Sequence, residues 1–224
     1  MDIGLYPLLQ EHLLARHDFF MEQVRARVFE NFSNLEEEAD AAANDAWQRF
    51  MSQPSHGEDD PGDYADAATE AGIDFYEYGM NMKRQITLAC LATLYHAWEK
   101  DVRSHLEREI QRWGCRTAKQ DQLWTAPVSD ILDFLESQGW KIRAKQWYVL
   151  LDACRLIVNV YKHGKGSSFD DLKKTYPQYL KCDYQVFEAD YESLEITEEE
   201  FDELGGAVRQ FWHDFPRILK YSAQ

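Results

Sequence analysis

Apolar side chains recur at three- and four-residue steps along most of the chain, which is the spacing of an amphipathic α-helix. The first helical pattern covers residues 5–32, and a capping-box sequence at 33–36 predicts a second helix that runs to about residue 51. These two helices predict an N-terminal helical hairpin over residues 1–52. Gly, Pro and acidic residues then dominate residues 53–63, which indicates an acidic linker.

Residues 64–224 predict a helical bundle with long antiparallel helices. The expected elements are a short helix over 65–71 that ends at Gly72, a long helix over 74–113, and helices over 128–138, 143–162 and 197–219. Residues 184–196 alternate weakly between apolar and polar side chains, which indicates an extended segment. The expected fold class is therefore all-α.

Composition narrows the setting of this bundle. Apolar residues make up 45% of the 224, so the chain can bury a core without covalent staples. The cysteines lack zinc-ligand spacing and are expected to be free thiols in a reducing compartment: Cys90, Cys115, Cys154 and Cys182. The N-terminus lacks a signal peptide's basic region, and the longest uncharged run, 85–98, is shorter than the ~20 residues of a membrane span. We expect a soluble, cytoplasmic protein without a membrane partner.

Charge is distributed unevenly along the chain. The formal net charge is −16, yet residues 141–181 contain nine basic and only three acidic residues, a local net charge of +6. The remainder therefore carries −22. Two interpretations of the basic segment stay open, because it can hold a phosphate ligand or dock onto the protein's own acidic surface.

The helix predicted over 143–162 falls inside this basic segment and carries the candidate site. At about 100° per residue, four polar side chains share one arc of this helix, and they are Arg155, Asn159, Lys162 and His163, which directly follows the predicted range. Arginine can grip phosphate oxygens, and histidine can transfer a proton near neutral pH. A structural interpretation is also open, because Lys162 and His163 are typical of a helix end and Arg155 can pair with Asp152 one turn earlier.

This pattern resembles the HEPN superfamily (higher eukaryotes and prokaryotes nucleotide-binding domains) over residues 74–219. Its members are helical bundles with an Arg and a His near the end of a late helix, and the run 94–99, Leu-Tyr-His-Ala-Trp-Glu, resembles the helix packed beside it. The resemblance implies a metal-independent endoribonuclease of a bacterial toxin or phage-defence system, active as a homodimer and without a cofactor. It implies that Arg155, Asn159 and His163 are catalytic and that Lys162 and Lys165 bind RNA.

Two further alternatives follow from the residues. His96 and Glu99 lie three residues apart on the long helix, so they either support the site from behind or form a hydrogen-bonded pair of their own. The strongly acidic remainder of the chain suits a non-catalytic helical interaction protein, such as an antitoxin, immunity or scaffold subunit, with a basic protein partner.

Overall fold

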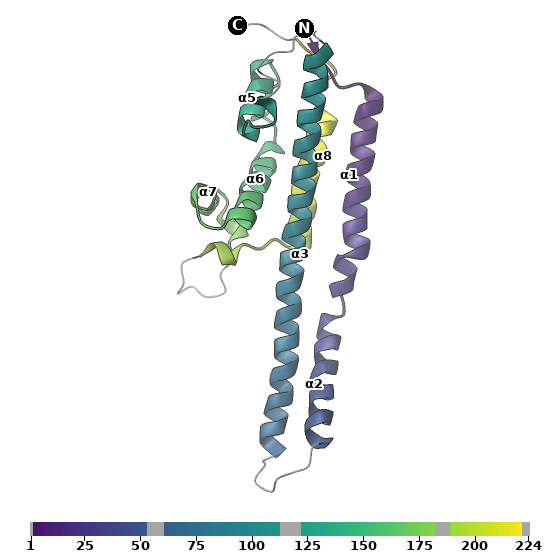
Figure 1. The fold of residues 1–224 in the computed structure, drawn as a ribbon, viewed down its shortest axis with the longest axis vertical. Helices are drawn as coiled ribbons and strands as arrows, with labels where there is room; N and C mark the ends of the chain where they lie inside the picture. The colour runs from purple at the N-terminus through teal and green to yellow at the C-terminus, as the bar shows by residue number, and fades with distance from the viewer. Residues whose placement is uncertain (1, 53–60, 113–121, 182–188, 221–224) are drawn as a thin grey trace. The chain divides into compact units, whose positions relative to one another are not determined.

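The computed structural model describes residues 2–52, 61–112, 122–181 and 189–220, and this part of the chain is an all-α helical protein (Figure 1). The predicted fold class is confirmed. The α-helices are α1 (Pro7–Arg27), α2 (Leu35–Ser52), α3 (Pro61–Arg112), α5 (Val128–Ser137), α6 (Tyr148–His163), α7 (Ser167–Thr175) and α8 (Glu198–Asp214). Short 3-10 helices lie between these α-helices at Phe29–Phe32, Pro177–Tyr179 and Tyr191–Ser193. The strands β1 (Asp2–Ile3) and β2 (Leu219–Lys220) pair antiparallel, with Ile3 opposite Leu219.

The chain divides into two compact units, Met1–Glu22 with Leu88–Gln224 and Gln23–Thr87. Both boundaries between the units fall inside helices, one in α1 and one in α3. The first half of α3 belongs to the same unit as α2. The predicted linker at 53–63 lies mostly outside the described residues. The predicted division into 1–52 and 64–224 stays a prediction.

In the unit Gln23–Thr87, α2 and the first half of α3 run side by side as an antiparallel hairpin (Figure 1). The predicted break at Gly72 is wrong, because α3 continues through it without interruption. A Cβ atom at Gly72 would lie 2.9 Å from Cβ of Ala43, and one at Gly79 would overlap the side chain of Leu35. These glycines therefore allow two helices to approach closely and do not end a helix.

In the other unit, the core is dominated by aromatic rings. Phe211 of α8 is fully buried, and its ring centroid lies 5.0 Å from that of Trp140 and 5.1 Å from that of Trp98 on α3. The same ring also contacts Trp147, Trp212 and Phe215. This aromatic cluster joins α3, α8 and the turn that precedes α6.

Local signals set the ends of α6 and α8. Thr197 and Glu200 form a capping box at the start of α8, the helix predicted to begin at residue 197. The helix ends at Asp214, earlier than the predicted residue 219, because Pro216 forces the preceding Phe215 into an extended conformation. Helix α6 begins at Tyr148, not at 143, and Gly164 with a φ of 67° ends it as glycine commonly does.

Other predictions concern the cysteines and the extended segment. Cys154 is buried and free, and burial raises the pKa of its thiol; Cys90 is free and half-buried. Cys115, Cys182 and residues 184–188 of the predicted extended segment lie outside the described residues. Within the described ranges, no helix is long and apolar enough to cross a membrane.

Asp214 at the end of α8 ties the turn before α6 to the bundle. Its carboxylate accepts hydrogen bonds from Trp147 Nε1 at 3.0 Å, Lys145 Nζ at 3.2 Å and Gln210 Nε2 at 2.9 Å. Burial raises the pKa of Asp214, but hydrogen bonds from Trp147, His213, Lys145 and Gln210 outweigh it and lower the pKa to about 2. The ionised carboxylate therefore stabilises the folded chain above its ordinary pKa of 3.8.

We expect an Asp214→Asn variant to be less stable than the wild type at pH 7. This deficit should shrink as pH falls from about 4 to 2, because the wild type protonates its carboxyl group there and loses the same contribution. Urea unfolding at several pH values measures this difference. A deficit that stays constant over this range would contradict the assignment.

Candidate functional site

Helix α6 is held in place by its apolar face. Leu156, Ile157, Val158 and Val160 are each 1% exposed, as the sequence pattern predicts. This helix packs against α7 and α8. The polar arc lies on the remaining face, where Arg155 and Asn159 are half-buried and Lys162 and His163 are exposed. The arc thus becomes more open to solvent toward the C-terminal end of α6.

Arg155 is engaged by an acid on its own helix. Its Nε and Nη2 atoms lie 2.9 Å and 2.8 Å from Oδ1 of Asp152, while the hydroxyl of Tyr176 donates to Oδ2 of the same carboxylate at 3.2 Å. The Asp152 pairing allowed by the sequence is therefore the one present. Tyr176, which follows α7, is a participant that the sequence did not reveal, because it lies 24 residues away.

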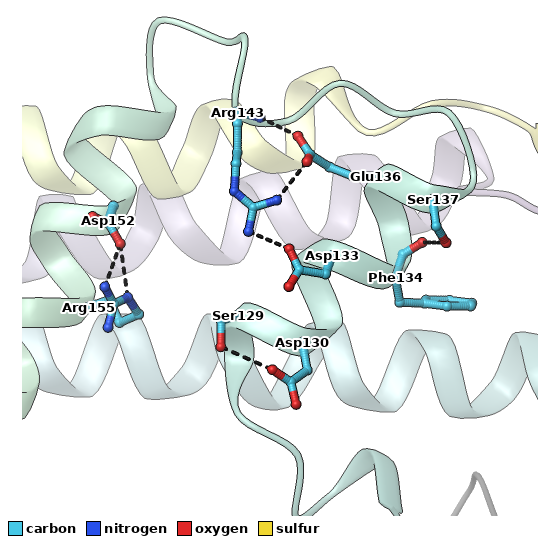
Figure 2. A network of polar contacts seen from close by, with 9 residues as sticks. All are labelled: Ser129, Asp130, Asp133, Phe134, Glu136, Ser137, Arg143, Asp152 and Arg155. Atoms are coloured by element: carbon cyan, nitrogen blue, oxygen red, sulfur yellow. Dashed lines mark hydrogen bonds and ion pairs between the residues drawn. The ribbon is translucent and has the colours of Figure 1, made fainter.

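Arg155 also lines a cavity of about 340 Å³ between α3, α5 and α6. Its walls include the second guanidinium group of Arg143 and the aromatic rings of Tyr95, Trp98 and Tyr148. Figure 2 shows Arg143 held between Glu136 and Asp133, and Arg155 against Asp152. Each guanidinium group at this cavity is thus neutralised by the chain's own carboxylates.

His163 does not line this cavity with Arg155. Eight residues at a rise of ~1.5 Å place the two about 12 Å apart along the helix axis. Within the described part of the chain, Asn159, Lys162 and His163 have no hydrogen-bonding or ionic side-chain partner. The exposed end of α6 therefore carries a cation, an imidazole and, one turn back, an amide, all available to a ligand.

The remaining predicted residues are partly engaged elsewhere. Lys165 pairs with Asp190 at 3.0 Å and lies over the ring of Tyr191. His96 Nδ1 lies 3.4 Å from Oε2 of Glu99, whose other oxygen pairs with Arg103, so His96 and Glu99 do contact each other. His96 also lines a cavity of about 540 Å³ together with Tyr161 of α6, which places it beside the helix that carries the site.

The basic segment is largely neutralised within the chain. In the described part of the chain, at least five of its nine cations have a carboxylate partner, and these five are Arg143, Lys145, Arg155, Lys165 and Lys181. The interpretation that this segment docks onto the protein's own acids therefore accounts for most of its charge. Lys162 is an exception, since no acid in the described ranges pairs with it.

Comparison with known proteins adds no family to this description. The chain matches no family model, no curated protein and no solved structure. Among the described residues, no group of three or more His, Cys, Asp or Glu side chains is arranged to hold a metal ion. The function must therefore be argued from the geometry of the site.

We expect Asp152→Ala to destabilise the chain by about 1–3 kcal/mol, because it leaves the half-buried Arg155 and the buried Tyr176 without their shared acceptor. Urea unfolding measures the change. Glu11→Ala on α1 is the matched control, since Glu11 is exposed and should change the free energy of unfolding by less than about 0.5 kcal/mol. Equal effects of the two variants would contradict a structural role for Asp152.

Proposed function

We propose that the chain is a metal-independent endoribonuclease of a bacterial toxin or phage-defence system. The observation that carries the proposal is the open end of α6, where Asn159, Lys162 and His163 are free of partners in the described part of the chain. These are the groups that phosphate-ester chemistry requires: a cation for the phosphate and an imidazole for proton transfer.

In the proposed reaction, the 2′-hydroxyl oxygen of RNA attacks the adjacent phosphorus atom. The bond from phosphorus to the 5′-oxygen breaks, which leaves a 2′,3′-cyclic phosphate and a 5′-hydroxyl group. His163 either accepts the proton of the 2′-hydroxyl, while solvent water protonates the leaving 5′-oxygen, or donates a proton to that oxygen, while water accepts the 2′-hydroxyl proton. Lys162 binds the phosphate, and Asn159 orients the imidazole or the phosphate. Lys165 assists RNA binding when it leaves Asp190.

Arg155 needs a rearrangement to take part. Its guanidinium group must leave Asp152 before it can grip a phosphate, and within one chain it lies about two helical turns from His163. We infer that a homodimer resolves this separation, because a second copy can bring its own His163 toward Arg155. His96 and Glu99 then act as positioning residues on the neighbouring helix α3.

The direct test is incubation of the purified chain with single-stranded RNA, with and without EDTA. We expect chelator-resistant cleavage that yields cyclic-phosphate ends, and no cleavage of a DNA strand of the same sequence, because DNA lacks the 2′-hydroxyl. Cleavage that EDTA abolishes, or that proceeds equally on DNA, would exclude this mechanism.

A second candidate function is a non-catalytic helical interaction protein. It is favoured by the Arg155–Asp152 pair, which already satisfies the one arginine of the polar arc. An antitoxin, immunity or scaffold subunit of this kind would bind a basic protein through acidic helices. Absence of RNA cleavage together with a stable complex with a basic partner would support this function over the first.

A further inference from the structure

The first half of α3 exposes an unusual run of large apolar side chains. Between residues 73 and 82, six of them are exposed, and these are Ile73, Phe75, Tyr76, Tyr78, Met80 and Met82. Tyr78 is 70% exposed and Met82 is 57% exposed. Isolated exposed apolar residues are ordinary on protein surfaces, but such a concentration on nearly three turns of helix typically marks a binding surface.

The hairpin cannot cover these side chains, because it is closed by small residues. Gly72 and Gly79 lie on the same face of α3 and bring it against Leu35 and Ala43 of α2. At about 100° per residue, Phe75, Tyr78 and Met82 fall on one narrow strip roughly a quarter-turn from the two glycines. We call these three residues the apolar strip.

The charge around the apolar strip selects its partner. The described helices of the hairpin, 35–52 and 61–87, contain ten acidic residues and three basic residues, Arg49, Lys83 and Arg84. The back of α3 carries a ridge of carboxylates, Asp63, Asp66, Glu70, Asp74 and Glu77, none paired with a cation in the described part of the chain. Asp74 lies one turn from Tyr78, so the ridge borders the strip.

We propose that the apolar strip is a docking site for a basic amphipathic helix of a protein partner. The partner's apolar face packs on Phe75, Tyr78 and Met82, and its Lys or Arg residues face the carboxylate ridge. A second copy of this hairpin carries the same negative charge and would be repelled, as would RNA or an anionic membrane. This proposal rests on the second candidate function, the helical interaction protein, and names the surface that such a protein would use. It does not depend on RNA cleavage.

The probe is a labelled 18-residue peptide of Lys and Leu that forms an amphipathic helix, with a scrambled peptide of the same composition as its control. We expect the full chain to bind the amphipathic peptide more tightly than the scrambled one. The variant Phe75→Gln/Tyr78→Gln/Met82→Gln should weaken this binding at least about tenfold. The variant Leu8→Gln/Phe19→Gln, which replaces exposed apolar residues of α1 outside this hairpin, should bind as the wild type does.

Two further variants keep the test decisive. Tyr78→Gln alone changes a side chain that is mostly solvent-exposed, so it should weaken binding while circular dichroism shows unchanged helix content. His163→Ala should bind the peptide normally, which separates this proposal from the ribonuclease. Equal binding by the wild type and the triple variant would overturn the proposal. So would a wild-type dimer that the triple variant converts to monomer, because a second copy would then cover the strip.

Discussion

Replacing His163 by alanine is expected to reduce the rate of RNA cleavage by about a hundredfold or more. Removal of a positioned proton-transfer group typically costs a factor of 10²–10⁴ in rate. The substitution should leave stability nearly unchanged, because His163 is exposed at the last turn of α6 and has no side-chain partner in the described ranges. Cleavage of a fluorescent RNA substrate measures the rate, and urea unfolding checks the fold.

The matched control for this experiment is His12→Ala. His12 is exposed on α1 and, like His163, has no partner in the part of the chain that the structure describes. The substitution His12→Ala should therefore leave both the rate of RNA cleavage and the free energy of unfolding unchanged. If His163→Ala and the wild type cleave RNA at the same rate, the activity belongs to another site or to a contaminating nuclease, and the proposed chemistry at α6 is wrong.

Arg155 offers a second measure of the same site. If the guanidinium group leaves Asp152 to hold the phosphate, Arg155→Ala slows cleavage as well as destabilising the chain. If the pair with Asp152 is purely structural, Arg155→Ala lowers stability but leaves the rate per folded molecule unchanged. Arg155 is paired with Asp152 in the structure, so its replacement can change stability as well as the cleavage rate. The two quantities must therefore be measured separately.

Local signals were enough to predict much of the helical layout. The Thr197–Glu200 capping box and Gly164 act through hydrogen bonds and dihedral angles within one turn, and both end or begin helices where the sequence predicts. The helix was wrongly predicted to end at Gly72. This glycine instead allows α2 to pack closely against α3, a tertiary contact that the local sequence pattern does not indicate. The end of α8 was placed too late because apolar spacing continues past Pro216.

The candidate site shows the same difference between local features, which the sequence predicts, and tertiary contacts, which it does not. The polar arc follows from helical periodicity alone, and Asp152 lies within reach of Arg155 on the same helix. The partners that neutralise the basic segment come from distant positions, as Asp214 does for Lys145 and Glu200 for Lys181. Helical spacing therefore identified which side chains share a face, but only the folded chain could tell which of them are already occupied.

The largest loss of stability is expected from Phe211→Ala. The ring of Phe211 is fully buried at the centre of the aromatic cluster, where it meets Trp98, Trp140 and three other rings. Replacement of a buried phenylalanine by alanine removes its burial energy and leaves a cavity, which together cost about 3–5 kcal/mol. Rigid indole neighbours cannot collapse into the space, so we expect a value in the upper part of this range.

Urea unfolding followed by tryptophan fluorescence measures this effect directly, because the cluster contains several of the chain's tryptophans. Phe19→Ala is the matched control, since Phe19 is 63% exposed on α1 and should change stability by less than about 0.5 kcal/mol. A loss below about 1 kcal/mol for Phe211→Ala would contradict the packing described here. The turn before α6 would then be held mainly by Asp214, which bonds Lys145 and Trp147, and by the contact of Trp140 with Phe215.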